Sequence, residues 1–310
     1  MRRTKYAIHA DFKRWKHLNP PLNRALLPVM QKTLGLIFGR QKSAEKLAVT
    51  REAIPTADGN TIRALLYTPA GLERNAPCLV YYHGGGFVLP AAPYHYRLAG
   101  EYALRAACKV LFVDYRLAPQ HPFPTAPEDC YAAYAWLLAQ AEALAIDPAR
   151  VAVAGDSAGG LLATVVCLMA RERGAATPCA QMLIYPVTGR DMATESMKQY
   201  TDTPMCNSRD MAKYDRLYMQ DPAAGKEEYA SPIHAESLAA LPPAYIETAE
   251  FDCLRDGGIL YAERLRQAGV QVRLRNSEGT MHGFDIVRDS AIVRACVEQR
   301  IDFLRTSFVE

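Results

Sequence analysis

Long apolar runs are missing from this sequence of 310 residues. A helix that crosses a membrane needs about 20 consecutive apolar residues, and every apolar run here is shorter or interrupted. The basic segment 1–5 is followed neither by an uninterrupted apolar stretch nor by a small-residue cleavage site, so no export signal is predicted. These absences predict a soluble protein of the cytoplasm without stable membrane insertion.

Paired cysteines are also missing. Eight cysteines are scattered singly along the chain, and no C-x-x-C pair offers a metal or redox site. Free cysteines usually pack as small buried hydrophobes, and several of these lie in apolar segments. We therefore expect reduced, mostly buried thiols, with no metal and no other cofactor. The eight are Cys78, Cys108, Cys130, Cys167, Cys179, Cys206, Cys253 and Cys296.

Acidic residues are scarce near the start of the chain. Residues 1–51 hold 12 Lys and Arg against only Asp11 and Glu45, whereas the remainder holds 24 basic residues against 31 acidic ones, a net charge of −7. A basic segment can contact nucleic acid, anionic lipid or an acidic partner, but these basic residues are spread out rather than blocked. The pattern favours a solvated face, so no nucleic-acid partner is expected.

The chain has the composition of a large globular core and the pattern of an α/β protein. Half of the residues are hydrophobic, enough to build one core around a single sheet. Strand-like and helix-like runs alternate, as in a mostly parallel sheet with helices on both faces. The predicted strands are 62–67, 78–82, 109–114, 151–154, 182–185, 244–248 and 270–274, and the predicted helices are 22–38, 126–141, 160–171, 260–267 and 292–304.

The alternation lapses between residues 188 and 231. This segment contains five methionines with three tyrosines between them, a composition that suits an adaptable apolar surface. We expect an insertion that lies over the sheet and lines a substrate pocket together with the helix 22–38. The alternative is that these side chains only bury one another.

A G-x-S-x-G motif directly follows the predicted strand 151–154 and precedes a helical run. It reads Gly155-Asp156-Ser157-Ala158-Gly159. A serine on a tight strand-to-helix turn is held in a strained backbone with its hydroxyl exposed, and the flanking glycines let neighbouring chain approach closely. Ser157 is therefore the predicted nucleophile.

A glycine run follows the predicted strand 78–82 and reads His83-Gly84-Gly85-Gly86-Phe87. Acyl transfer develops an oxyanion, and unobstructed backbone N–H groups can stabilise it. We assign the donors to Gly85, Gly86 and Ala158, with Gly84 as the alternative to Gly86. A plain turn or a phosphate loop is the competing interpretation, but no Gly-Lys-Ser/Thr follows and the spacing of a dinucleotide site is missing.

A serine hydroxyl needs a base, and the base needs a third group to orient it. His282 follows the last predicted strand, where a loop at the carboxyl edge of the sheet can bring it over Ser157. Asp252 lies closest to the end of the strand 244–248 and is the predicted acid. Asp256 more readily starts the next helix, where a carboxylate is favoured by the helix dipole.

Together these motifs resemble those of the bacterial hormone-sensitive-lipase-like esterases, from about residue 50 to the C-terminus. The order Ser157, Asp252, His282 is the one expected for an α/β hydrolase. The matching stretches are 83–86, 155–160, the acid motif 252–256, 282–284 and, as a structural brace, the loop 115–124. The sequence departs from the family at Cys253, where the family usually has a proline after the acid.

The resemblance implies a mostly parallel eight-stranded α/β-hydrolase sheet, a helical cap, and hydrolysis of short-chain acyl esters such as acetyl esters. The corresponding division is a cap segment 1–49, core 50–187, cap insertion 188–231 and core 232–310. The expected partner is a small-molecule acyl ester. The sequence is compatible with both a monomer and a homodimer. An amidase or carbohydrate deacetylase would use the same triad, and a ligand-binding protein could share the fold.

Overall fold

The computed structural model describes the chain except for residues 1–4, 16–23, 25, 39–41 and 310. Its centre is one eight-stranded sheet with the order β1-β2-β4-β3-β5-β6-β7-β8. The pairings of β2 with β1 and β4 are antiparallel, and the other five are parallel. The predicted α/β-hydrolase sheet is thereby confirmed. The strands are β1 (Leu47–Pro55), β2 (Thr61–Pro69), β3 (Ala76–Tyr82), β4 (Lys109–Asp114), β5 (Ile146–Asp156), β6 (Gln181–Ile184), β7 (Ala244–Phe251) and β8 (Val272–Met281).

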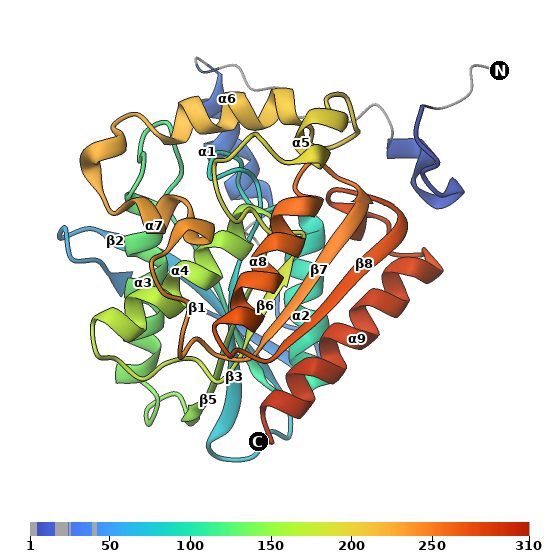
Figure 1. The fold of residues 1–310 in the computed structure, drawn as a ribbon. Coiled ribbons are helices and arrows are strands. Elements are labelled where there is room, and N and C mark those ends of the chain that lie inside the picture. The colour runs from blue at the N-terminus through green and yellow to red at the C-terminus, as the bar shows by residue number, and fades with distance from the viewer. Residues whose placement is uncertain (1–4, 16–23, 25, 39–41, 310) are drawn as a thin grey trace.

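Helices cover both faces of the sheet (Figure 1). The α-helices are α1 (Leu27–Phe38), α2 (Pro93–Ala106), α3 (Thr125–Ala139), α4 (Ala158–Glu172), α5 (Glu195–Gln199), α6 (Ser208–Tyr218), α7 (Glu227–Ala230), α8 (Arg255–Gln267) and α9 (Ala291–Ser307). Short 3₁₀ helices are η1 (Ala10–Trp15), η2 (Pro222–Ala224), η3 (Pro232–His234) and η4 (Phe284–Ile286).

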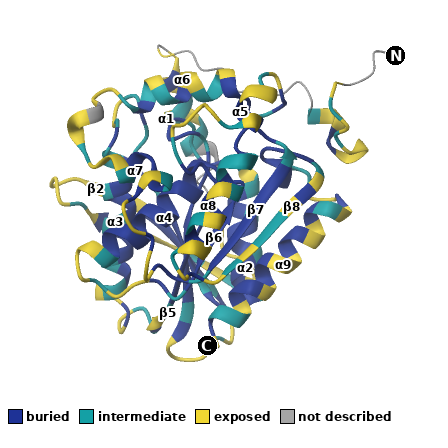
Figure 2. Ribbon diagram, in the orientation of Figure 1, coloured by how far each residue is buried: buried dark blue, intermediate teal, exposed yellow. Residues whose placement is uncertain are grey.

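Alternation along the strands divides the core into two layers. In β3, Val80 and Tyr82 belong to the apolar cluster that includes α3, α4 and α8, whereas Leu79 and Tyr81 belong to the cluster with α2 and α9. Successive side chains of a strand point to opposite faces, so each strand contributes to both layers. The central strands β3, β4, β6 and β7 are almost continuously buried, and Figure 2 shows this buried interior in dark blue, with β8 only partly buried.

The predicted strands and helices exist, with shifted boundaries. The last strand begins at Val272 instead of residue 270 and continues to Met281, so that it ends directly before His282. The edge strand β1 was not predicted as a separate strand, because only Ile54 of its residues is buried and its apolar pattern is weak. The predicted helix 22–38 is observed from Leu27 onward, and its first residues fall partly outside the described residues.

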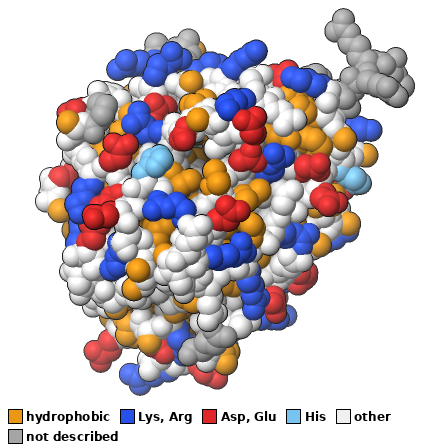
Figure 3. Space-filling model, in the orientation of Figure 1, with side chains coloured by type: hydrophobic (Ala, Val, Ile, Leu, Met, Phe, Trp, Pro, Cys, Tyr) orange, Lys and Arg blue, Asp and Glu red, His pale blue; other side chains and the backbone are white. Residues whose placement is uncertain are grey.

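The segment 188–231, where the strand-helix alternation was expected to lapse, contains the α-helices α5, α6 and α7 and the 3₁₀ helix η2 and, in its described residues, no strand. Figure 1 shows α5 and α6 with α1 at one end of the sheet. On the face shown in Figure 3, charged side chains of both signs are interspersed, and Lys and Arg lie along the edge over α6. None of the described helices is long and apolar enough to cross a membrane.

Candidate active site

Ser157 lies on the turn between β5 and α4, in a backbone conformation that costs energy. Its φ is 55° and its ψ is −118°, a region that residues other than glycine rarely adopt. The flanking glycines make this turn possible: a Cβ on Gly159 would overlap the carbonyl of Tyr82, and a Cβ on Gly155 would overlap the carbonyl of Gly159. The serine side chain is therefore fixed at the carboxyl end of β5, close to the end of β3.

His282 and Asp252 meet Ser157 at this edge of the sheet. Asp252 follows β7 and His282 follows β8, and these two strands are parallel neighbours. The His282 Nε2 lies 2.9 Å from the Ser157 Oγ, and the His282 Nδ1 lies 2.7 Å from the Asp252 Oδ2. With the proton on Nδ1, the imidazole donates to the carboxylate and accepts from the serine hydroxyl. The structure thus brings the three predicted residues together.

The environment of His282 favours its protonated form. Burial acts to lower the pKa of His282, but the charge of Asp252 and the hydrogen bond to it act in the opposite direction, and the pKa is raised to about 9. Asp252 is fully buried, and its second oxygen accepts the backbone N–H of Leu254 at 3.0 Å. Asp252 is thus oriented on both sides and can stabilise an imidazolium.

Asp256, the alternative acid, points elsewhere. It lies in the first turn of α8, where its carboxylate accepts the backbone N–H of Ser196 at 2.7 Å and pairs with Arg255. Its contacts are with the insertion rather than with His282.

The glycine run after β3 presents free backbone donors. The Gly84 N–H donates to the Asp156 Oδ1 at 3.0 Å, so this amide is already engaged. In the part of the chain that the structure describes, no acceptor is found for the amides of Gly85 and Gly86. Ala158 is the first residue of α4, and the first amides of a helix have no acceptor within it. The amides of Gly85, Gly86 and Ala158 are thus free to bind a ligand oxygen, whereas that of Gly84 is not.

Asp156 links the nucleophile turn to the glycine run, a role that the sequence did not reveal. Its Oδ1 also accepts the Tyr81 hydroxyl at 2.8 Å, and its Oδ2 faces the Tyr94 hydroxyl at 3.3 Å and the His95 Nε2 at 3.0 Å. The Ala92 N–H donates to the His95 Nδ1 at 2.8 Å, so the His95 proton lies on Nε2 and is donated to Asp156. Burial acts to raise the pKa of Asp156, but His95 and these donors lower it to about 2.

A second buried network holds the loop that carries His282. Arg300 in α9 is fully buried and pairs with Glu247 at 2.8 Å and with Asp285 at 2.9 Å. Asp285, three residues after His282, also accepts the Tyr185 hydroxyl at 2.7 Å. The sequence signals for this network were an arginine on the apolar face of a helix and a glutamate, Glu247, inside an apolar strand. Two carboxylates compensate the buried guanidinium.

The loop after β4 braces the glycine run, as the resemblance suggested. The Tyr115 hydroxyl donates to the carbonyl of His83 at 2.7 Å, and the two rings stack with centroids 4.5 Å apart. Further along, the Ala118 N–H donates to the carbonyl of Phe87 at 2.9 Å. The brace therefore holds both ends of the segment that presents the free amides.

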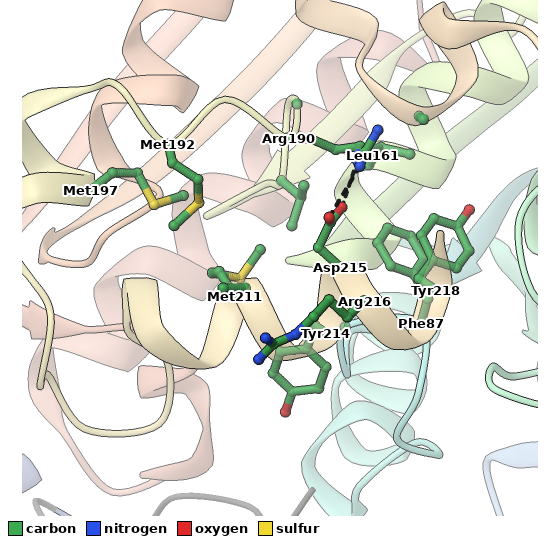
Figure 4. Close-up of a pocket in the computed structure, with 15 residues that line it drawn as sticks. Phe87, Leu161, Arg190, Met192, Met197, Met211, Tyr214, Asp215, Arg216 and Tyr218 are labelled. Carbon is green, nitrogen blue, oxygen red and sulfur yellow. Dashed lines mark hydrogen bonds and ion pairs between the residues drawn. The ribbon is translucent and has the colours of Figure 1, made fainter. Parts of the chain in front are cut away.

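A cavity of about 270 Å³ lies beside this edge, between the core and the insertion (Figure 4). Residues of the insertion line this cavity together with core residues, but no described residue of α1 lines it. Instead the Gln31 side chain of α1 donates to the carbonyls of Val88 and Ala118. Most lining residues are apolar, and one ion pair, Arg190 with Asp215, crosses the wall. Its lining includes Gly86, Phe87, Leu161, Met192, Met197, Met211, Tyr214 and Tyr218.

Two aromatic residues of the insertion bring the cavity against the glycine run. The Tyr214 ring packs on Gly86 so closely that a Cβ there would overlap it. Tyr218 stacks on Phe87 with ring centroids 4.0 Å apart.

Among the described residues, no cluster of three or more metal-ligating side chains is found.

Comparison with known proteins supports the same chemistry. A family model described as alpha/beta hydrolase fold matches residues 79–286. Esterase LipI of Mycobacterium tuberculosis is 39% identical over 231 residues, covering 73% of this chain and 70% of that protein. The ethyl acetate hydrolase of Pseudomonas putida is 37% identical over 257 residues, covering 82% and 80%. A bacterial heroin esterase structure superposes with a TM-score of 0.87 at 32% identity, covering 97% and 98%.

Proposed function

The chain belongs to the hormone-sensitive-lipase-like family of α/β hydrolases and is a carboxylic ester hydrolase, and on that premise we propose that Ser157, His282 and Asp252 form its catalytic triad. The observation that carries the proposal is the continuous chain from the Ser157 Oγ to His282 Nε2 at 2.9 Å and from His282 Nδ1 to Asp252 at 2.7 Å. The contact between Ser157 and His282 is short enough for proton transfer, and the contact between His282 and Asp252 is short enough to orient the imidazole.

The chemistry follows from these contacts. The Ser157 oxygen attacks the ester carbonyl while its proton passes to the His282 Nε2, and Asp252 stabilises the resulting imidazolium. The oxyanion accepts hydrogen bonds from the amides of Gly85, Gly86 and Ala158. His282 then protonates the departing alcohol, and an acyl group stays on Ser157. Water, deprotonated by the same imidazole, releases the acid and restores the serine.

We further propose that the acyl group is short, as in acetyl esters. Neither Ser157 nor His282 lines the cavity of about 270 Å³ beside Gly86, so its volume does not set the acyl length. The Tyr214 ring packs on Gly86 and limits the room for a long chain next to the oxyanion donors. The similarity to an enzyme named ethyl acetate hydrolase agrees with a short acyl group.

We propose the division into a core of residues 50–187 and 232–310 and a cap of residues 1–49 and 188–231. Two sets of contacts support it. Gln31 of α1 bonds the loops after β3 and β4, and Ser196 of α5 bonds the loop that carries Asp252. The cap segments therefore contact the loops that carry the site.

A substrate series tests the acyl preference. Initial rates are measured for p-nitrophenyl esters from acetate to laurate, together with an acetylated sugar and an acetanilide. We expect the largest kcat/KM at two to four carbons and slow turnover of the anilide. A maximum at long chains would contradict the short-acyl proposal, and a preference for the sugar or the anilide would favour a deacetylase or an amidase.

A further inference from the structure

Two cysteine side chains meet directly behind the catalytic acid. The Cys206 Sγ and the Cys253 Sγ are 3.9 Å apart. Cys206 belongs to the insertion, just before α6, and Cys253 immediately follows Asp252. The side chains are 4% and 0% exposed.

The two cysteines lie in segments that are already held together. The Cys253 carbonyl accepts the Ser196 hydroxyl of α5 at 2.8 Å, and the Asp256 N–H donates to the same Ser196 oxygen at 3.1 Å. On the other side, the Met205 methyl group lies 3.2 Å from the position of a Cβ on Gly283. The segment around Cys206 therefore packs against both the acid loop and the histidine loop.

The remaining cysteines have other surroundings. Cys296 contacts the Ser277 hydroxyl, and Cys78 and Cys108 face backbone carbonyls. Cys179 is half-buried, the most accessible of the eight. Among the described residues, Cys206 and Cys253 form the one hydrogen-bonding contact between two cysteine thiols.

We propose that Cys206 and Cys253 are a site of reversible oxidation, at which a peroxide converts the two thiols to a disulfide that ties the insertion to the loop carrying Asp252. The Cys206 sulfur, the less buried one, attacks a peroxide oxygen, so that the O–O bond breaks and sulfenic acid and one water form. The Cys253 sulfur attacks the sulfenic sulfur, the S–O bond breaks, and a second water carries away the remaining proton. Two thiols and one hydrogen peroxide give one disulfide and two waters.

The disulfide changes the geometry beside the acid. An S–S bond is about 2.05 Å long, so the two sulfur atoms must approach each other from 3.9 Å. Cys253 is bonded to Asp252 along the chain, and this approach shifts the acid relative to His282. Displacements of about 1 Å at a catalytic group can cost about 10²-fold in rate. Oxidation therefore lowers esterase activity, and reduction restores it.

Diamide tests the site, since it takes up two electrons and two protons from a thiol pair and spares the methionine thioethers of the cavity. The full chain is treated with diamide, unreacted thiols are alkylated, and peptides are mapped by mass spectrometry without reduction. We expect a disulfide-linked peptide pair containing Cys206 and Cys253. This readout is independent of activity, so it separates the oxidation site from the proposed function. Alkylation of both cysteines after diamide treatment would overturn the proposal.

Activity and matched variants test the consequence. Treated wild type loses at least tenfold in kcat/KM for p-nitrophenyl acetate and regains it with dithiothreitol. Cys206→Ser and Cys253→Ser keep their starting activity and resist diamide, whereas Cys179→Ser responds like wild type. Linkage with unchanged kcat/KM, or reversible inactivation of Cys206→Ser, would refute the coupling to the acid loop.

Discussion

Gly84 and Asp156 are joined by a hydrogen bond of 3.0 Å, from the Gly84 N–H to the Asp156 Oδ1. Each partner is directly followed in the sequence by a residue of the proposed site: Gly85 follows Gly84, and Ser157 follows Asp156. A Cβ on Gly84 would overlap the Asp156 carboxylate, so the glycine run and the nucleophile turn are in direct contact. The spacing between nucleophile and oxyanion donors therefore depends on this buried carboxylate.

Replacing Asp156 by Asn tests that dependence. An amide NH₂ would face the His95 Nε2–H and the Tyr94 hydroxyl, leaving at least one buried donor without an acceptor. Such a loss costs about 1–3 kcal/mol. We expect a lower melting temperature and a lower kcat with little change in KM. The control Asp147→Asn removes only a surface pair with Arg150, and equal effects of the two variants would contradict the assigned role.

Asp252→Asn tests the orientation of the base. An amide favours the wrong tautomer of His282, and an equivalent change in a serine protease lowers kcat by about 10⁴. We expect a loss of that order in p-nitrophenyl acetate hydrolysis, with the melting temperature changed by a few degrees. Asp256→Asn is the matched control four residues away, since its carboxylate bonds Ser196 and Arg255. A larger loss in the control would reassign the acid.

The pH dependence of kcat/KM follows from the raised pKa of His282. Burial opposes the shift, but the buried charge of Asp252 raises this pKa from 6.5 to about 9. The base acts in its deprotonated form, so activity increases with pH and levels off above about 9 rather than above 6.5. Rates are measured from pH 6 to 10 and corrected for spontaneous hydrolysis. A plateau reached already at pH 7 would show that Asp252 does not raise the pKa of His282.

Arg300→Met tests the buried network behind the histidine loop. The change leaves Glu247 and Asp285 without their cation, and removing one partner of a buried pair costs about 3–5 kcal/mol. Chemical denaturation should show that loss, and the displaced Asp285 should also lower kcat. Arg305→Met, on the exposed side of the same helix, is expected to change unfolding by less than about 1 kcal/mol. Wild-type stability of Arg300→Met would be incompatible with the network.

The parts of the site that the sequence predicted are those next to strand ends. Ser157, Asp252 and His282 each follow a strand with a clear apolar pattern, and parallel strands bring their carboxyl ends to one edge. Gly85 and Gly86, the proposed oxyanion donors, were chosen for the same reason. Local pattern and topology were sufficient there, because no side-chain contact had to be known in advance.

The contacts that support the site could not be predicted from the sequence, because they join segments that are far apart in the chain and share no repeating pattern. Asp156 meets His95 across 61 residues, and Arg300 meets Glu247 across 53. The helices α5 and α7, of five and four residues, are too short for a helical repeat to stand out, since short helices depend on tertiary packing. The Cys206–Cys253 contact likewise appears only when the insertion folds over the acid loop.

The most direct test of the account is the reaction of Ser157 with a fluorophosphonate, followed by intact mass together with p-nitrophenyl acetate hydrolysis. We expect one adduct per wild-type chain, located on Ser157, and loss of activity in step with labelling. Ser157→Ala, folded by circular dichroism, should take no label and lose at least about 10⁴ in rate. Wild-type-like hydrolysis by Ser157→Ala would contradict the central claim.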